Sequence, residues 1–312
     1  MQDQRILIFG RTGQVGWELR PKLAGLGQVT AVGLPEVDFA RPDSIRAAVR
    51  AHEPAVIVNA AAYTAVDKAE AEPELARAIN ATGPGVLAEE AKRSGALLIH
   101  YSTDYVFDGT KKGPWVEADA ANPLGVYGRT KLEGDQAIAT SGCDHLIFRT
   151  SWVYGARGKN FLLTMLKLGK ERPEIRIVDD QIGSPTSSEC IAQATADVLV
   201  QLETKEGLQI HGRSGVYNLA CGGEASWFRF ADAIFSRAEA KLGQASPKLI
   251  PITTSEFPTA AKRPANSRLS CQRLAEAFGV RLPDWEQALD LVMETLVDMV
   301  LSSSELDGPG GI

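Results

Sequence analysis

A tyrosine and a lysine lie four residues apart in the segment Tyr127-Gly-Arg-Thr-Lys131. On a helix this spacing places both side chains on one face. A free tyrosine titrates at about pH 10, and a nearby ammonium favours the tyrosinate, so we expect Lys131 to lower the pKa of Tyr127. The pair is then a candidate proton relay. The same spacing also occurs in ordinary exposed pairs, and the neighbouring motifs have to decide between the two interpretations.

Three glycines at intervals of three residues, Gly10, Gly13 and Gly16, separate an apolar segment at residues 5–9 from a helical pattern at residues 17–24. Between a strand and a helix, Gly10 permits a tight turn, Gly13 lets the backbone approach a pyrophosphate, and Gly16 lets the helix pack closely. The start of the helix then presents its free N–H groups to an anion. This position favours a dinucleotide-binding turn over a glycine-rich turn without a ligand.

The second predicted strand, at residues 28–32, ends without an acidic residue. In a dinucleotide site an acid at this point binds the ribose 2′-hydroxyl. Here Gly33 follows the strand, and the first acid is Glu36. The 2′-phosphate of NADP is therefore not excluded, and Arg11 of the glycine turn could face it.

Two further segments are candidates for the adenosine half of the cofactor site. Asp38-Phe39 precedes a predicted helix, and in this fold class such a pair often flanks the adenine. A third predicted strand, at residues 55–59, runs into the small residues of the segment 60–64. Small side chains there allow a cofactor to lie across the strand end, although a well-packed turn is the alternative.

Strands and helices alternate as far as residue 150. Further strands are predicted at residues 96–101 and 145–149, and the helix that carries Tyr127 spans about residues 123–140. The alternation predicts an α/β fold with a doubly wound, Rossmann-type parallel sheet. Hydroxyl groups at the carboxyl end of a strand in such a sheet, as at Ser102-Thr103, lie where ligands bind.

Beyond residue 150 the pattern loosens, which predicts two domains. We assign residues 1–150 to a dinucleotide-binding domain, with segments near residues 185–220 returning to it. Residues 151–301 then form mainly a smaller C-terminal substrate-binding lobe, with the ligand between the lobes. Residues 302–312, rich in Ser and Gly, are expected to be disordered.

The composition favours a small-molecule partner. The 312 residues carry a net charge of −6 without long charged runs, which argues against nucleic acid or an anionic membrane as the main partner. The N-terminal apolar run is too short for a signal sequence or a membrane span. The cysteines are far apart and form no C-x-x-C motif, so we expect a reduced, cytoplasmic chain without zinc or disulfides. They are Cys143, Cys190, Cys221 and Cys271.

An irregular segment near the C-terminus contains Arg263, Asn266 and Arg268. Two guanidinium groups there could bind a diphosphate in pairs. A solvated basic loop is the alternative.

The glycine turn, the Ser-Thr pair and the Tyr-x-x-x-Lys motif occur together and in this order. With them, the chain resembles the extended short-chain dehydrogenase/reductases over nearly its whole length. The resemblance is carried by GRTGQVGWEL (10–19), VIVNAAAYTAVDKAE (56–70), HYSTDYVFDG (100–109), PLGVYGRTKLEG (123–134), LIFRTSWVYG (146–155), DDQIGSPTS (179–187) and RPANSRL (263–269).

Within that superfamily, the resemblance implies reduction of dTDP-4-dehydro-6-deoxy-L-mannose at C4 by NADPH or NADH, giving dTDP-L-rhamnose. Tyr127 would protonate the C4 oxygen and Thr103 would hydrogen-bond to it, while Lys131 would hold the nicotinamide ribose. The family pattern assigns the pyrophosphate to Gly13, Gln14 and Val15, and the adenosine side to Asp38, Phe39, Ala62, Tyr63 and Thr64. It assigns the sugar to Thr103, Asp104 and Trp152.

The resemblance also raises a metal site and a homodimer as expectations. Some relatives bind Mg²⁺ through glutamates at a dimer contact, and Glu18 and Glu189 match two of those positions. The third position, near Glu294, is displaced by one residue.

Three alternative functions stay open at this point. Another nucleotide-sugar 4-ketoreductase or an epimerase would share the same motifs. A dehydratase would carry a glutamate as base after Thr103-Asp104, where this chain has Tyr105. A non-catalytic NADP-binding regulatory subunit would be expected to lose the Tyr-x-x-x-Lys motif, which is intact here.

Overall fold

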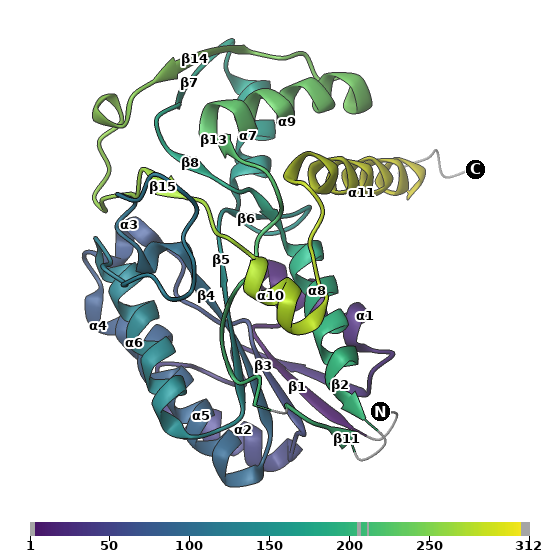
Figure 1. Ribbon diagram of the computed structural model, residues 1–312. Coiled ribbons are helices and arrows are strands. Elements are labelled where there is room, and N and C mark those ends of the chain that lie inside the picture. The colour runs from purple at the N-terminus through teal and green to yellow at the C-terminus, as the bar shows by residue number, and fades with distance from the viewer. Residues whose placement is uncertain (1–3, 205–206, 211, 307–312) are drawn as a thin grey trace.

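The computed structural model describes residues 4–204, 207–210 and 212–306, which form a sheet domain and a smaller lobe that packs against the carboxyl ends of its strands (Figure 1). The sheet has six parallel strands in the order β12-β5-β4-β3-β1-β2. Its strands are β1 (Arg5–Phe9), β2 (Gln28–Val32), β3 (Val56–Asn59), β4 (Leu97–Thr103), β5 (His145–Thr150) and β12 (Gly215–Asn218). The predicted doubly wound α/β fold is confirmed.

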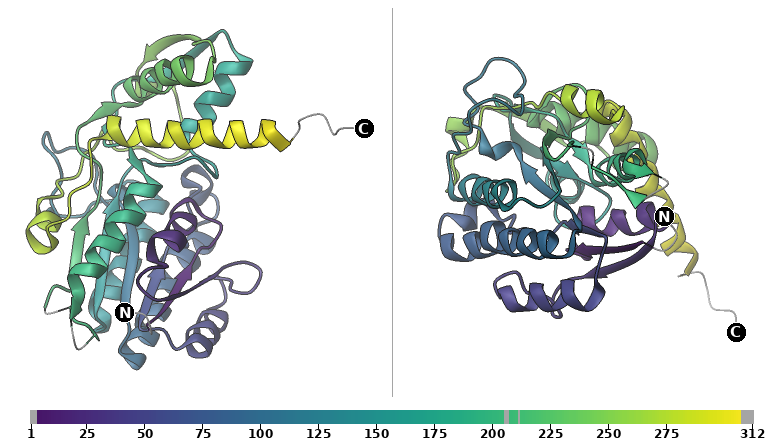
Figure 2. Two further views of the ribbon diagram at one scale, coloured as in Figure 1. Left: turned by 90° about the vertical axis from the view of Figure 1, so that its right-hand side faces the viewer. Right: turned by 60° about the horizontal axis from the view of Figure 1, so that its bottom comes forward.

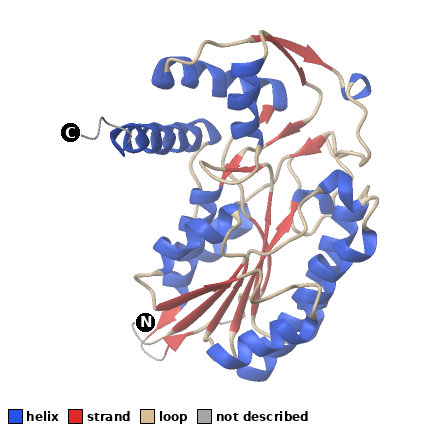
Figure 3. Ribbon diagram, turned by 180° about the vertical axis from the view of Figure 1, so that it is seen from behind, coloured by secondary structure: helices blue, strands red, loops and turns tan. Residues whose placement is uncertain are grey.

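Helices cover both faces of this sheet (Figure 3). One face packs on α1 (Gln14–Leu23), α8 (Ser188–Leu202) and α10 (Gln272–Phe278). The other packs on α2 (Pro42–His52), α5 (Gly83–Ser94) and α6 (Val126–Ser141). Because both faces are covered, the central strands β3, β4 and β5 are buried along their whole length, which explains their continuous apolar runs.

The smaller lobe has a hydrophobic core of its own, formed largely by α7 (Phe161–Glu171), α9 (Trp227–Leu242) and α11 (Trp285–Leu306). A parallel pair, β7 (Glu174–Val178) and β14 (Lys248–Ile252), covers one side of it. The remaining strands are β6 (Val153–Tyr154), β8 (Ile182–Gly183), β9 (Thr186–Ser187), β10 (Glu203–Thr204), β11 (Gly207–Leu208), β13 (Ala225–Ser226) and β15 (Asn266–Ser267). Two 3₁₀ turns span Asp104–Val106 and Thr254–Glu256.

Between β3 and α5 the chain forms α3 (Val66–Ala69), α4 (Pro73–Arg77) and a π-helical turn, Ala78–Thr82. The π-helical turn directly precedes Gly83-Pro84. Arg77, Thr82 and Gly83 all have right-handed helical backbone, so Pro84, which has no N–H group, lies within a continuous helix directly after the π-helical turn.

The C-terminal helix corrects one expectation. α11 continues to Leu306, so residues 302–306, expected to be disordered, are helical. The Ser302 hydroxyl bonds back to the carbonyl of Asp298, at 2.8 Å, which lets the serine remain in the helix. Residues 307–312, the rest of the expected disordered tail, lie outside the described residues. Across the described part of the chain, no helix combines the length and apolar character needed to span a membrane.

Candidate active site

The glycine turn packs tightly against the residues that follow β3. Gly10 has a φ of +92°, and a methyl group added there would lie 2.7 Å from the backbone of Ala60. A methyl group at Gly16 would lie 2.1 Å from the carbonyl oxygen of Gly10. Gly13 precedes α1, and no side chain caps that helix. The turn therefore leaves the helix start facing outward for an anion, and it fits the pyrophosphate of a dinucleotide.

Arg11 extends from this turn toward the end of β2. Its guanidinium group lies 2.9 Å from a carboxylate oxygen of Glu36 and 3.1 Å from the carbonyl oxygen of Leu34. The side chain therefore lies beside the position where the second strand of a dinucleotide fold meets the adenosine ribose.

The residues assigned to the adenosine side have different environments. Phe39 is buried in the core, where its ring contacts the edge of Phe9 at 5.6 Å between centroids. Asp38 is half-buried and accepts a hydrogen bond from the Ala40 N–H group. Tyr63 follows β3 with Ala62 and Thr64, and its hydroxyl donates to Glu72 at 2.5 Å. Phe39 is thus part of the hydrophobic core, whereas Asp38 and Tyr63 are only partly buried.

An asparagine that the sequence pattern did not single out joins the two halves of the site. Asn80 lies in the π-helical turn and is buried. Its amide accepts from the Tyr63 N–H at 2.8 Å and donates to the Tyr63 carbonyl at 3.1 Å and to the Thr130 hydroxyl at 3.3 Å. One side chain therefore connects the adenosine-side turn to the catalytic helix, and π-helical turns often occur at functional sites.

The helix α6, which carries Tyr127 and Lys131, is capped by a residue distant in sequence. Gly125 at its N-terminus offers no side chain, and the Val126 N–H group donates to Glu70 at 2.8 Å. A carboxylate at this end of a helix is also favoured by the helix dipole. Glu70 was not predicted; only its place in the VDKAE segment, which carries the resemblance, could have indicated it.

Tyr127 and Thr103 meet at the carboxyl end of β4, as the order of the motifs suggested. The Tyr127 side chain lies beside the Thr103 hydroxyl, and its ring contacts Tyr105 at 5.6 Å between centroids. Burial raises the pKa of Tyr127 above its ordinary value, and the neighbouring Asp104 adds to this. The predicted lowering of this pKa by Lys131 is therefore wrong for this geometry. A raised pKa keeps the phenol protonated, as a proton donor requires.

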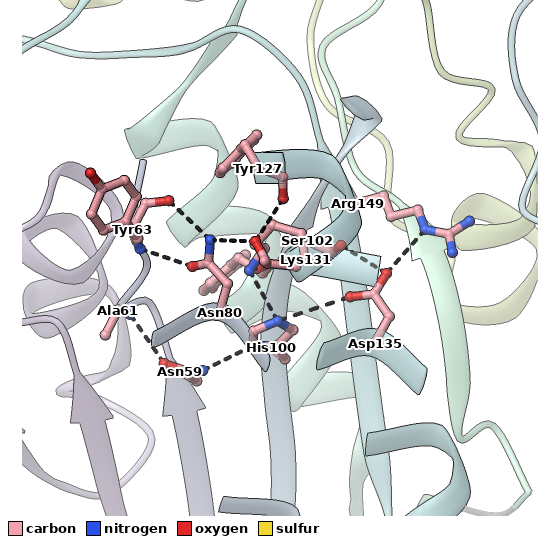
Figure 4. A network of polar contacts seen from close by, with 12 residues as sticks. Asn59, Ala61, Tyr63, Asn80, His100, Ser102, Tyr127, Lys131, Asp135 and Arg149 are labelled. Atoms are coloured by element: carbon pink, nitrogen blue, oxygen red, sulfur yellow. Dashed lines mark hydrogen bonds and ion pairs between the residues drawn. The ribbon is translucent and has the colours of Figure 1, made fainter. Parts of the chain in front are cut away.

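Lys131 lies at the bottom of the site and is buried (Figure 4). Its ammonium nitrogen lies 2.6 Å from the carbonyl oxygen of Tyr101 and 3.1 Å from Nε2 of His100. Burial lowers the pKa of Lys131 to about 8. The lysine is thus held by the strand beneath it and not by Tyr127.

Asp104 lies under the smaller lobe and is 3% exposed. It accepts a hydrogen bond from the Thr103 hydroxyl at 3.0 Å, and Ser267 of the smaller lobe lies beside it. Burial raises the pKa of Asp104 to about 6. The carboxyl group is therefore close to its titration midpoint in mildly acidic solution.

Trp152 adopts an unusual backbone conformation at the junction of the lobes. Its φ is +47°, and its indole stacks on Trp227 with 3.5 Å between ring centroids. A methyl group added at Gly183 would collide with this indole, at 2.5 Å. Left-handed backbone in a bulky residue persists only where the surroundings impose it, and such strain clusters at functional sites.

A cavity of about 820 Å³ lies in the smaller lobe between α7, β7, β14 and the segment 256–263. Trp227 and Arg263 form part of its wall. Its volume suits a nucleotide-sized ligand. Arg263 is held there by Asp67 of the sheet domain, with 2.7 Å between nitrogen and oxygen.

Arg268 lies elsewhere, on a separate cavity of about 360 Å³. Its guanidinium group binds Glu224 at 2.6 Å and the Lys112 carbonyl at 2.5 Å. Asn266 donates to two backbone carbonyls of the segment 111–113. The structure therefore does not bring the two arginines together on one cavity, and only Arg263 remains a candidate for the diphosphate.

The two glutamates proposed for Mg²⁺ lie near each other, but a lysine accompanies them. Glu189 pairs with Lys22 at 3.0 Å, and burial, followed by the charge of Glu189, raises the pKa of Glu18. Glu294 instead pairs with Lys241 at 3.0 Å. Within the described residues, no group of three His, Cys, Asp or Glu side chains could hold a metal ion. This donor set does not fit Mg²⁺, and we assign no metal.

The fold and the site define a class of protein. A glycine turn at the first β-α junction, with Thr103, Tyr127 and Lys131 at the same edge of the sheet, is the arrangement expected of the short-chain dehydrogenase/reductase class. The model of the family described as the RmlD substrate binding domain matches residues 4–297. The chain belongs to this family.

Curated relatives are similar over almost their full length. The dTDP-4-dehydrorhamnose reductase of Burkholderia thailandensis is 48% identical, with 94% of this chain and 99% of the relative covered. The enzyme of the same name from Escherichia coli K12 is 45% identical, over 93% and 97% of the two chains.

Solved structures agree with this assignment. A dTDP-4-dehydrorhamnose reductase from Clostridium acetobutylicum superposes with a TM-score of 0.86 at 37% identity, covering 94% of this chain and 99% of that one. The enzyme of the same name from Bacillus anthracis, solved in complex with NADP, gives 0.85 at 33% identity, over 94% and 100% of the chains.

Proposed function

We propose that this chain is an NAD(P)H-dependent oxidoreductase that reduces dTDP-4-dehydro-6-deoxy-L-mannose at C4 to dTDP-L-rhamnose. The observation that carries the proposal is the full-length match to dTDP-4-dehydrorhamnose reductases combined with an assembled Thr103–Tyr127–Lys131 site. The product is a precursor of cell-surface polysaccharides such as the O-antigen of lipopolysaccharide.

Residues of the chain have separate roles in the proposed reaction. The bound nicotinamide cofactor supplies a hydride to C4 of the sugar. Negative charge then grows on the C4 oxygen, where the protonated Tyr127 donates its proton and Thr103 donates a hydrogen bond. Lys131 holds the nicotinamide ribose and restores the proton of the tyrosine. Asp104 and Trp152 orient the sugar at the junction of the lobes.

We assign the cofactor, NADPH or NADH, to the glycine turn and the segments beside it. Gly13 lets the pyrophosphate approach the backbone, while Gly10 and Gly16 allow the tight turn and the close packing of the helix. Gln14 and Val15 contribute N–H groups of the first helical turn. Arg11 faces the ribose 2′ position. Asp38 and the segment 62–64 contact adenosine.

The nucleotide of the substrate is assigned to the 820 Å³ cavity of the smaller lobe. Arg263 lies on its wall, and Trp227 connects it to Trp152 at the sugar site. Residues 1–150 and 151–301 would thus bind cofactor and substrate respectively, with α8, β12 and α10 completing the first domain.

A dehydratase activity is not supported, because the residue after Asp104 is Tyr105. Burial raises the pKa of Tyr105 to about 12, so this side chain stays protonated and does not act as a base near pH 7.

The test is NAD(P)H oxidation with enzymatically prepared dTDP-4-dehydrorhamnose beside the corresponding GDP and UDP sugars. We expect turnover with the dTDP sugar and dTDP-L-rhamnose as the product by NMR. Turnover that prefers another nucleotide, or a C4 epimer as the product, would reassign the enzyme to another branch of the superfamily.

We also propose a homodimer through the face formed by α1 and α11. Trp17 and Leu291 are 42% and 49% exposed, and α11 projects from the smaller lobe (Figure 2). Sedimentation of the full chain, with Leu291→Lys as the disruptive variant, tests this. A monomer at micromolar concentration would contradict it.

The four cysteines are free thiols, in keeping with a cytoplasmic location, which cell fractionation would test.

A further inference from the structure

A chain of buried polar side chains lies directly beneath Lys131 (Figure 4). Nε2 of His100 lies 3.1 Å from the lysine nitrogen, and Nδ1 lies 2.9 Å from the amide nitrogen of Asn59. His100 is 0% exposed, and Asn59 and Lys131 are 1% exposed. Because these groups are buried, their polar atoms must find hydrogen-bond partners within the protein and not in water.

The orientation of Asn59 determines which imidazole nitrogen carries the proton. Its amide oxygen accepts a hydrogen bond from the Ala61 N–H group at 3.1 Å, so its NH₂ group faces His100. An NH₂ group only donates, so Nδ1 of His100 must accept. Burial and the charge of Lys131 lower the pKa of His100 well below its usual value, which keeps the ring neutral. A neutral ring that accepts at Nδ1 carries its proton on Nε2.

This tautomer presents a donor to Lys131. An ammonium group also has only donors, so the 3.1 Å contact becomes a hydrogen bond when the lysine is neutral and offers a lone pair. When the lysine is charged, Oδ1 of Asp135 lies 4.0 Å from Nε2 of His100 and is an acceptor for its N–H group. That oxygen is buried and has no hydrogen-bond partner among the described residues.

The other charged groups around Lys131 either favour its charged form or are already paired with other residues. Asp135, on the same helix as Lys131, favours the ammonium form. Its second oxygen accepts from the Ser102 hydroxyl at 2.8 Å and lies 3.4 Å from Nε of Arg149 on β5. The protonated Tyr127 above carries no charge. His100 is therefore the group in contact with Lys131 that favours its neutral form.

We propose that His100, held by Asn59 in the Nε2–H tautomer, is a positioning residue that stabilises neutral Lys131 and so promotes release of the lysine proton during the reduction. In this step, Tyr127 gives its proton to the C4 oxygen and becomes a tyrosinate. Lys131 then releases the proton that restores the tyrosine, and its new lone pair accepts the hydrogen bond from His100. The proton that Lys131 loses is regained from solvent in the next cycle. The step rests on the proposed function, whereas the tautomer does not.

The tautomer is tested by NMR of the full chain labelled with ¹⁵N-histidine. The protein has four histidines, and His100→Gln identifies the signal by its loss. We expect a proton on Nε2 and an unprotonated Nδ1 throughout pH 6–9. A proton on Nδ1, or a doubly protonated ring, would overturn the proposal whatever the substrate is.

The role in turnover is tested by the pH profile of kcat. His100→Gln replaces the fixed donor by an amide that can turn its oxygen toward the ammonium, which then holds its proton more tightly. We expect the alkaline limb of kcat to move upward by about one pH unit, a tenfold change in proton affinity, with the KM for the sugar nucleotide unchanged.

His145→Gln is the matched control, because His145 is also buried, on the neighbouring strand β5, with its Nδ1 bonded to the Cys143 carbonyl at 2.9 Å. It should leave the alkaline limb in place. A uniform loss of kcat in His100→Gln, without movement of that limb, would reduce His100 to a structural residue. Absence of turnover with every sugar nucleotide in the wild-type enzyme would instead refute the proposed function and leave the NMR result standing.

Discussion

Replacement of Arg11 by alanine is expected to change the cofactor preference without harming the fold. The guanidinium group lies beside the end of β2, bonded to Glu36 and to the Leu34 carbonyl, and it is about one-third exposed. Exposed ion pairs contribute only about 0–1 kcal/mol to stability, so the variant should fold normally. A charge-assisted contact with a 2′-phosphate is worth about 1.5–3 kcal/mol, or roughly 10- to 150-fold.

We therefore expect Arg11→Ala to lower kcat/KM for NADPH by at least about tenfold, while kcat/KM for NADH changes less than about threefold. In the wild-type enzyme both cofactors should be accepted within about tenfold of each other, because Gly33 offers no carboxylate and a tenfold preference needs only ~1.4 kcal/mol. Glu36→Gln should favour NADPH, since it removes the negative charge that competes for Arg11.

Arg5→Ala is the matched control, because Arg5 forms a similar exposed pair with Glu53, at 3.2 Å, at the opposite end of the sheet. Initial-rate kinetics with both cofactors measures all three variants. Equal losses for NADPH and NADH in Arg11→Ala would refute the assignment of Arg11 to the 2′ position. A wild-type kcat/KM for NADH far above that for NADPH would contradict the inference that Gly33, which offers no carboxylate, lets the site accept NADPH.

Three further predictions concern the helix cap, the diphosphate and pH. Glu70→Ala should lower the unfolding free energy by about 1 kcal/mol, as for a lost helix cap, and should also reduce kcat. The control, Glu74→Ala at an exposed position, should do neither. Equal melting temperatures of the two variants would contradict this. Arg263→Ala should raise the KM for the sugar nucleotide about 10- to 150-fold with kcat nearly unchanged, whereas Arg268→Ala should leave KM unchanged. Inhibition by dTDP checks both variants. A normal KM in Arg263→Ala would place the diphosphate elsewhere. Because burial lowers the pKa of Lys131 to about 8, kcat should fall as pH rises through that value, and a flat profile to pH 9.5 would contradict this.

Much of the fold follows from local patterns in the sequence. β1 is a short apolar run that is buried beyond Arg5, so its bounds could be predicted to the residue. The bounds of β2 were also predicted to the residue, although this edge strand is only partly buried. The glycine turn was predictable because close backbone contacts leave no room for a side chain at Gly10 and Gly16.

Other elements depend on contacts between distant segments, which a local pattern does not contain. The parallel pair of β7 and β14 joins segments about 75 residues apart. Pro251 lies within the second strand, where a proline argues against a strand. Glu70 caps a helix that begins 56 positions later. In the sequence, His100 is only one more residue of a predicted strand, and it is the folded chain that brings it to Lys131.

The same limit applies to the charges of the site. The spacing of Tyr127 and Lys131 predicted their common helix face, but it did not show that Tyr101 and His100 hold the lysine. Nor could the segment 263–268 show that Asp67 holds one arginine and Glu224 the other.

The central claim is that the Tyr127 hydroxyl donates the proton to the reduced sugar, and Tyr127→Phe tests it most directly. The substitution removes one hydroxyl and keeps the aromatic ring, so the melting temperature and the dissociation constant for NADPH should stay at wild-type values. Turnover of dTDP-4-dehydrorhamnose should fall by roughly 10²-fold or more, the scale of a lost general acid. Near-normal turnover in a folded, NADPH-binding Tyr127→Phe variant would contradict the mechanism.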